Sequence, residues 1–159
     1  MKHFIAAIVL ACPFTARAAK LELEVGAGHA LVAPAKSWTA RIGLDLFGHL
    51  TPSVRVMTQS PICCDTQTWA VLGELRAHTL GTVQLTAGLG LGVGTATVVR
   101  APDATVHFQR VPTRYAMGDL GLRFMLGDFW IGAGVARSTA WDGYLGTLSL
   151  GWAPLETRR

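Results

Sequence analysis

Strict alternation of apolar and polar residues, repeated over eight segments, constrains this chain more than any other feature of its sequence. In residues 82–97, for example, Leu85, Leu89 and Leu91 share one face with other apolar residues, while every second residue from Gly88 to Gly94 is glycine. Successive side chains of a β-strand point to opposite faces, so this period of two predicts strands. The predicted strands cover residues 20–31, 37–48, 52–59, 67–78, 82–97, 113–126, 129–137 and 143–153.

The connections between these segments alternate between short and long. The short ones comprise residues 48–51, 78–82 and 127–128, and the two longest comprise residues 58–66 and 100–112. In a ring of antiparallel strands, alternate connections lie at the same end. Long connections at one end and short turns at the other are typical of barrels that span the bacterial outer membrane. We therefore predict an all-β fold, an eight-stranded antiparallel up-and-down transmembrane β-barrel.

The first 18 residues have the organisation of a secretion signal. Lys2 and His3 precede the apolar run Phe4–Ala11, and Ala16 and Ala18 supply the small-x-small pattern of a cleavage site. Such a short apolar run cannot cross a bilayer as a helix, which needs roughly 20 residues. We expect residues 1–18 to be a signal peptide and residues 19–159 to form one barrel domain. A lipoprotein box ending at Cys12 is the alternative, but Leu10 fits that motif poorly.

The charge of the chain gives no support to nucleic-acid binding. The net charge of the whole sequence is +4, but Lys2 and Arg17 lie in the expected leader. The remaining residues hold 12 basic against 10 acidic side chains. They also contain no apolar run of the 18 or so residues that indicate a membrane-spanning helix.

The polar face of the predicted strands indicates which face is buried. Apart from Lys20 at the very start of the first strand, it carries five acidic residues and four arginines but no lysine. A water-exposed face would more often carry lysines and an excess of one sign, whereas arginine suits buried pairing with carboxylates. Because an eight-stranded ring encloses just enough space for side chains, we expect a closed, ion-paired lumen and an apolar face toward lipid. The expected lumen charges are Glu22, Glu24, Arg41, Asp45, Arg55, Glu74, Arg76, Asp119 and Arg123.

Aromatic residues lie near the ends of the predicted strands. Amphipathic rings at the two membrane interfaces form girdles around barrels of this kind. A general enrichment of aromatics in strands is the alternative explanation. The predicted girdle consists of Trp38, Trp69, Trp141 and Tyr144 near the long connections, and of Trp130 and Trp152, with Phe124 and Phe129, near the short ones.

The expected mature chain resembles the family of small outer-membrane β-barrels, the OmpA- and OmpX-like eight-stranded proteins. The motifs that carry the resemblance are Leu85–Thr95 (LTAGLGLGVGT), Gly118–Gly134 (GDLGLRFMLGDFWIGAG) and Gly146–Trp152 (GTLSLGW). The resemblance implies an outer-membrane location and a last strand that is bound by the barrel-assembly machinery. The family usually ends on its final aromatic residue, whereas Ala153–Arg159 follow Trp152 here. The fold itself is compatible with several functions.

A few barrels of this size are lipid-modifying enzymes, and the sequence lacks the catalytic residues that they use. A deacylase of this class has a His-x-Ser pair on late strands, but no histidine follows residue 113 and Ser138 and Ser149 stand alone. A serine nucleophile needs a base within hydrogen-bond reach. We interpret His29, His78 and His107 as interface or surface residues, and expect no catalytic residue.

Two further motifs carry no cofactor or metal prediction. The glycines at 88, 90 and 92 match a nucleotide-binding loop only in their spacing, because no helix follows the strand that contains them. Cys63 and Cys64 are adjacent and have no third cysteine or neighbouring histidine with which to hold a metal. We expect either a disulfide between them in the loop or an idle pair, that is, two free thiols without a role.

The sequence therefore predicts an outer-membrane barrel with a structural or surface-interaction role. Its expected partners are outer-membrane lipid, the barrel-assembly machinery and an extracellular ligand bound by residues 58–66 and 100–112. We expect a monomer that binds no nucleic acid and no cofactor. A soluble periplasmic carrier barrel, with its apolar face inward, and a lipid-modifying membrane enzyme are the alternatives.

Overall fold

A computed structural model describes residues 20–31, 35–46, 48–61, 67–100, 107–139 and 143–154. The expected signal peptide and both cysteines of the 58–66 connection lie outside these residues, as does Trp141. The strands are β1 (Lys20–Ala30), β2 (Ala35–Asp45), β3 (Leu50–Pro61), β4 (Thr68–His78), β5 (Val83–Arg100), β6 (His107–Leu126), β7 (Phe129–Ser138) and β8 (Tyr144–Trp152).

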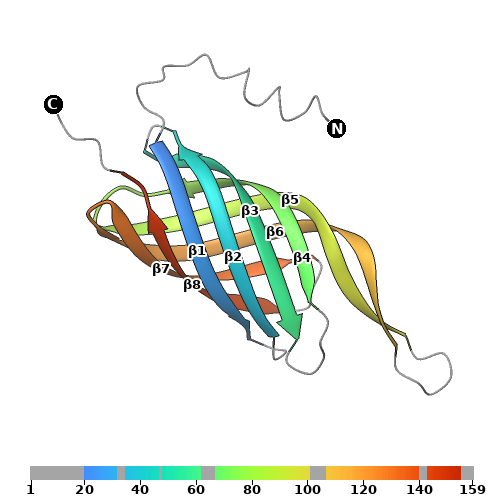
Figure 1. Ribbon diagram of the computed structural model, residues 1–159. Helices are drawn as coiled ribbons and strands as arrows, with labels where there is room; N and C mark the ends of the chain where they lie inside the picture. Colours follow the sequence, from blue (N-terminus) through green and yellow to red (C-terminus); the bar gives the residue numbers. More distant parts are fainter. Residues whose placement is uncertain are drawn as a thin grey trace, which may run out of the picture.

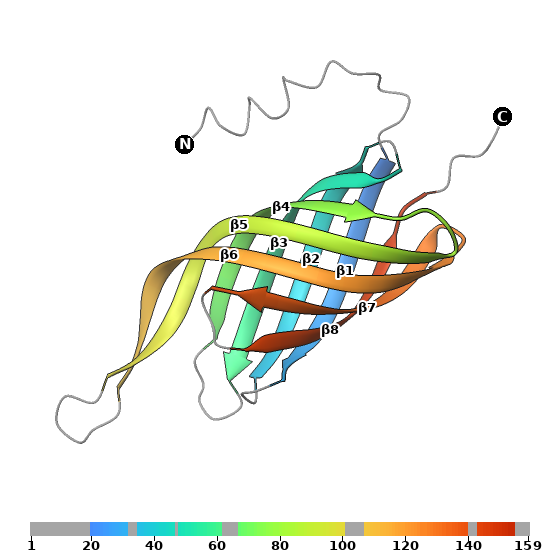
Figure 2. The same cartoon turned by 180° about the vertical axis from the view of Figure 1, so that it is seen from behind.

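The eight strands form one closed barrel (Figures 1 and 2). Each strand pairs antiparallel with its neighbours in sequence, and β1 closes the ring against β8, with Leu23 opposite Trp152. This architecture confirms the predicted fold class. No helix in the described part of the chain is long and apolar enough to span a membrane.

The connections divide the barrel into two ends. At one end, which we call the turn end, the chain reverses tightly between β2 and β3, between β4 and β5, and between β6 and β7. Gly48 and Gly127 lie in two of these turns with φ values of 72° and 66°, a region that favours glycine because it has no Cβ atom. The other end, the loop end, carries the connection between β5 and β6.

The two longest predicted connections are shorter in the structure. The prediction of a loop over residues 100–112 is wrong, because β5 continues to Arg100 and β6 begins at His107. Figure 1 shows these strands leaving the barrel together as a two-stranded ribbon. Similarly, β3 continues to Pro61, inside the connection expected over residues 58–66. The end of β3 still pairs with β2, through Lys36 opposite Ser60 and Ala35 opposite Pro61, whereas in the described residues the ends of β5 and β6 pair only with each other.

The polarity of the barrel is inverted relative to that of a water-soluble protein. Leu89 and Leu120 on the outer face are 76% and 68% exposed, whereas Glu22 and Arg123 on the inner face are only 2% and 3% exposed. Exposed apolar side chains continue around the ring on all eight strands. Since monomeric soluble proteins rarely expose apolar patches larger than a few hundred Å², this outer face matches a surrounding lipid phase.

The glycines of β5 permit close contacts on the inner face. A Cβ atom on Gly92 would collide with the backbone carbonyl oxygen of Val71 on β4. A Cβ atom on Gly90 would lie 2.8 Å from Cγ of Glu74, and one on Gly88 would lie 2.9 Å from Oδ1 of Asp119. These positions therefore leave room for the neighbouring backbone and for two of the carboxylate side chains inside the barrel.

Candidate functional site

The interior of the barrel is crossed by a continuous network of ion pairs. It joins four carboxylates to four guanidinium groups, so its formal charge is zero. Strands β1, β2, β3, β4 and β6 all contribute side chains because alternate residues of each strand point inward. The members of this network are Glu22, Glu24, Arg41, Arg55, Glu74, Arg76, Asp119 and Arg123.

One half of the network surrounds the two carboxylates of β1. Oε1 of Glu22 accepts hydrogen bonds from Nη2 of Arg41 at 2.8 Å and from Nη2 of Arg123 at 2.6 Å. The hydroxyl of Thr51 lies 3.3 Å from the other oxygen of Glu22. Arg41 also pairs with Glu24. Both carboxylates are therefore bound by arginines from β2 and β6, which lie on different sides of the barrel.

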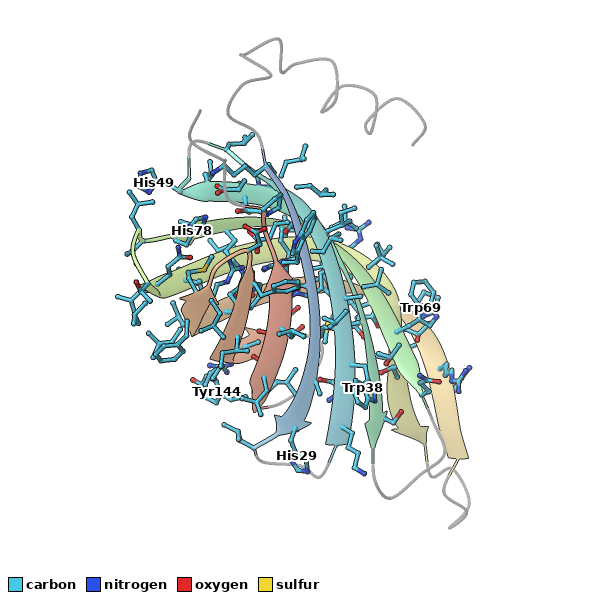
Figure 3. The ribbon with its side chains drawn as sticks, turned by 60° about the vertical axis from the view of Figure 1, so that its left-hand side comes forward. His29, Trp38, His49, Trp69, His78 and Tyr144 are labelled. Atoms are coloured by element: carbon cyan, nitrogen blue, oxygen red, sulfur yellow. The ribbon has the colours of Figure 1, made fainter. Side chains whose placement is uncertain are left out.

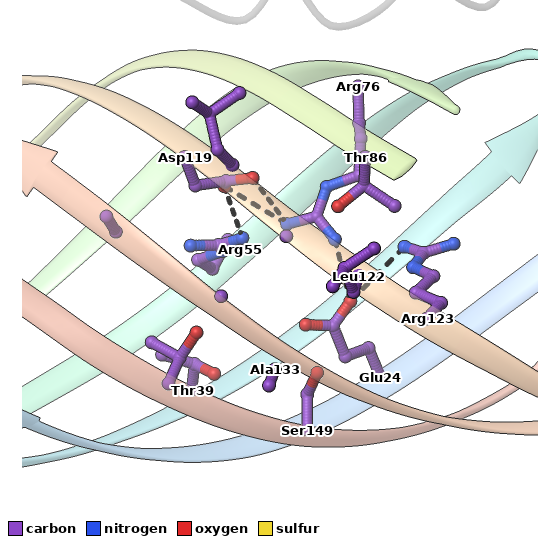
Figure 4. Close-up of a pocket in the computed structure, with 15 residues that line it drawn as sticks. Glu24, Thr39, Arg55, Arg76, Thr86, Asp119, Leu122, Arg123, Ala133 and Ser149 are labelled. Carbon is purple, nitrogen blue, oxygen red and sulfur yellow. Dashed lines mark hydrogen bonds and ion pairs between the residues drawn. The ribbon is translucent and has the colours of Figure 1, made fainter. Parts of the chain in front are cut away.

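The other half of the network is centred on Asp119. Nη2 of Arg76 lies 3.0 Å from each carboxylate oxygen of Asp119, and Nη2 of Arg55 lies 2.9 Å from one of them. Nε of Arg55 is 3.0 Å from Glu74. Arg76 also reaches Glu24 at 3.3 Å, which joins the two halves (Figure 4). Removing any one arginine would leave at least one carboxylate with fewer buried partners.

Little free space remains between these side chains. The cavity drawn in Figure 4 has a volume of about 30 Å³ and is lined by Glu24, Arg55, Arg76, Asp119 and Arg123, among others. That volume holds about one water molecule. Among the described residues, the charged side chains therefore pack closely around this small cavity.

Asp45 is the one predicted lumen charge that lies apart from this network. Its Oδ1 atom is 3.4 Å from Nε2 of His78, and both side chains are largely buried. The two residues end β2 and β4 at the turn end of the barrel, where Figure 3 labels His78. The interpretation of His78 as an interface or surface residue is therefore wrong, because its side chain turns inward. Sequence alternation contained this signal, since His78 is an even number of residues from Glu74 and Arg76 on the same strand and therefore points to the same face.

Trp130 is the clearest correction to the predicted girdle. Its side chain lies inside the barrel and is 1% exposed. The guanidinium of Arg123 stacks 4.0 Å from the centre of its ring. The indole packs against Gly151, where any Cβ atom would collide with it. The parity of β7 could have revealed this position, because Phe129 and Ile131 on either side of Trp130 both point outward.

The other described girdle residues lie on the outer face. Trp38, Trp69 and Tyr144 are 68%, 48% and 47% exposed, and Figure 3 shows them toward the loop end. The guanidinium of Arg137 lies 5.4 Å from the ring centre of Tyr144. Trp152 ends β8 at the turn end, opposite Phe129. That these residues form a girdle at two membrane interfaces stays a prediction.

The described residues contain no metal centre. No group of three or more histidine, cysteine, aspartate or glutamate side chains in these residues is arranged to hold an ion. The carboxylates that gather in the lumen are instead paired with arginines. Cys63 and Cys64 lie outside the described residues. The expectation that they form a disulfide or an idle pair stays a prediction.

Comparison with known proteins identifies the fold. No protein-family model matches the sequence, and no curated protein sequence resembles it. The structure is similar to the N-terminal β-barrel domain of OprF from Pseudomonas aeruginosa, with a TM-score of 0.68 and 13% identity, over 84% of this chain and 96% of that chain. Neisserial surface protein A gives a TM-score of 0.57 and 13% identity, over 86% and 94%. Both are eight-stranded outer-membrane barrels, and this chain has their fold.

Proposed function

We propose that this protein is an outer-membrane β-barrel whose closed body is a scaffold for interactions at its loop end. The inverted polarity of the barrel carries this proposal. Eight buried charges neutralise one another inside, and a ring of leucine, valine and isoleucine side chains is exposed outside. Lipid on the outer face removes that apolar surface from water, which stabilises the folded state by roughly 25 cal/mol per Å².

The sequence supports the same location. Residues 1–18 supply a signal for export, and Gly146–Trp152 resembles the strand that the barrel-assembly machinery binds. In the structure this segment belongs to β8, the last strand to complete the ring. The two solved structures compared above are outer-membrane barrels. We place the turn end, where β1 begins and β8 ends, in the periplasm, and the loop end outside the cell.

The filled lumen argues against the two alternatives. A soluble carrier barrel would need an apolar interior with space for a ligand, whereas this interior is charged and its cavity holds about one water molecule. The lipid-modifying enzyme, the second alternative, would need a nucleophile with a base beside it, and the late strands carry no histidine after residue 113 that could act as that base. The proposed role is therefore non-catalytic, and binding is assigned to loops that a rigid body carries.

Cell fractionation with accessibility labelling tests the location and orientation. A single protease site placed between residues 101 and 106 should be cleaved in intact cells. The same site placed beside Gly127 should be cleaved only after the outer membrane is permeabilised. The protein should remain in the outer-membrane fraction and change its gel mobility on heating. Recovery in the soluble periplasmic fraction would contradict the proposal.

The closed lumen predicts an absence of steady conductance. Because ion pairs cross the interior and leave room for about one water molecule, the purified protein in planar bilayers should show no sustained single-channel current. An eight-stranded barrel of this kind is filled by its own side chains. Stable, porin-like channels from the pure protein would show that the lumen opens in a membrane.

Shortening the loop end should separate folding from binding. Removing residues 97–110 and closing β5 to β6 with a tight turn should leave a folded, heat-modifiable barrel, because long surface connections contribute little to stability. Surface interaction by cells that express the variant should be lost. A control variant with a short glycine-serine insertion beside Gly81, in the turn between β4 and β5, should keep the interaction. Retained interaction after the first deletion would move the binding function into the barrel body.

A further inference from the structure

The ribbon formed by β5 and β6 extends well beyond its neighbouring strands. Six residue pairs, from Thr95 opposite Pro112 to Arg100 opposite His107, continue past the point where β4 stops pairing with β5. At about 3.3 Å per residue, these pairs extend the ribbon by about 20 Å. In the described part of the chain, no strand pairs with this outer stretch of β5. Its edge therefore resembles the unpaired edge of an open sheet.

Side chains end the ladder between β4 and β5 at Thr95. The backbone N–H of Trp69 donates to the hydroxyl of Thr95 at 3.3 Å and not to its carbonyl. That carbonyl instead accepts a 2.6 Å hydrogen bond from the hydroxyl of Tyr115. Both groups that would continue the ladder are thus occupied, and the backbone of β5 beyond Thr95 is separated from β4.

The register shows which backbone groups point away from the ribbon. Pro112 has no N–H, so its pair with Thr95 cannot be a hydrogen-bonded pair of the β5–β6 ladder. Hydrogen-bonded pairs alternate along an antiparallel ladder. Thr97 and Val99 therefore direct their N–H and C=O groups to the free side of β5, whereas Val98 bonds to β6. On β6 the corresponding edge is interrupted by Pro112, which makes the β5 edge the better one for pairing.

The charge of the ribbon indicates what kind of strand could pair there. Residues 95–114 contain Arg100, Arg110 and Arg114 against one acidic residue, Asp103. The side chains of Arg110 and Arg114 are exposed. A second copy of this ribbon would bring like charges together, which is unfavourable. An extended acidic segment would gain both backbone hydrogen bonds and charge complementarity.

We propose that the free edge of β5 at Thr97 and Val99 binds an acidic, extended segment of a partner protein by strand addition. This mode takes its affinity from main-chain hydrogen bonds and its specificity from side chains on alternate positions. The inference rests on the proposed location of the loop end outside the cell. The inference specifies that the β5 edge makes the contact at this end, and that the partner segment is extended and acidic.

A synthetic peptide that alternates glutamate with valine or threonine provides the probe, added to the full barrel in zwitterionic bilayer discs. Fluorescence anisotropy should show salt-sensitive binding. Thr97→Pro removes one edge N–H while leaving the β5–β6 ladder intact, as Pro112 already does on β6. It should weaken binding at least tenfold, whereas Thr97→Val keeps the N–H and should bind as the wild type does. Heat-modifiable gel mobility verifies that both variants fold.

Two further measurements test the pairing and its charge. Peptide should slow hydrogen exchange at the amides of Thr97 and Val99 more than at that of Val98, which is already bonded to β6. Arg110→Glu with Arg114→Glu should weaken binding at least tenfold, and a lysine version of the peptide should then bind better than the glutamate version. No binding, equal binding by Thr97→Pro, or binding only to anionic lipid vesicles would overturn strand addition. None of these outcomes affects the fractionation result, which tests the location separately.

Discussion

Replacing Arg41 with methionine should destabilise the barrel by about 3–5 kcal/mol, the usual cost of breaking a buried ion pair by removing one partner. Arg41 pairs with both Glu22 and Glu24, and it is 4% exposed. The substitution leaves both carboxylates buried with one arginine fewer between them. Unfolding by urea in lipid vesicles, followed by tryptophan fluorescence, should therefore show a lower midpoint.

A double variant distinguishes the destabilisation caused by a buried, unpaired carboxylate from that caused by the change in packing. Adding Glu24→Gln to Arg41→Met removes one of the two carboxylates that lost its partner and restores neutrality to the network. The double variant should therefore be more stable than Arg41→Met alone. If it is less stable by the sum of the two single effects, the side chains act by packing and the network is not held by charge pairing.

Replacing Leu89 with arginine should cost about 2–4 kcal/mol of stability in lipid, as a lipid-facing arginine near the bilayer midplane does. Leu89 lies in the middle of the outward face of β5 and is 76% exposed. Such a change on the surface of a soluble protein would usually stay within about 0.5 kcal/mol. Reversible refolding into vesicles of phosphatidylcholine provides the measurement.

Leu80→Arg is the matched control for this substitution. Leu80 is also exposed, at 65%, but it lies in the turn between β4 and β5, outside the proposed membrane span. The same chemical change should have little effect there, because the cost of an arginine falls to about 0–1 kcal/mol near the interface. Equal stability of both variants, in a protein that stays soluble without detergent, would show that the apolar face does not meet lipid.

Much of this fold could be predicted from the sequence because its information is local. The period of two defines a strand and assigns each residue to a face, so Leu89 and Gly90 receive opposite positions before any partner strand is known. The polarity of the two faces also indicates that charges such as Glu74 and Arg76 point inward. The eight strands and their antiparallel order were predicted correctly on this basis.

The sequence could not determine which charges meet. Glu22 and Arg123 are 101 positions apart, and their contact depends on how far β1 and β6 are staggered around the ring. The same stagger places Asp45 beside His78 and away from the central network. Parity gives the direction of each side chain, but only the closed barrel fixes its height along the axis.

The tertiary structure also decided the positions of Trp130 and of the ribbon. An aromatic residue near a strand end is compatible with either a girdle or the lumen, and the space over Gly132 and Gly151 is what admits the indole of Trp130. Residues 95–100 pair with residues 107–112 beyond the point where β4 stops pairing with β5. Alternation arises only where one face is buried, so the sequence by itself determined the wall of the barrel, while the length of the ribbon depended on pairing between two strands outside it.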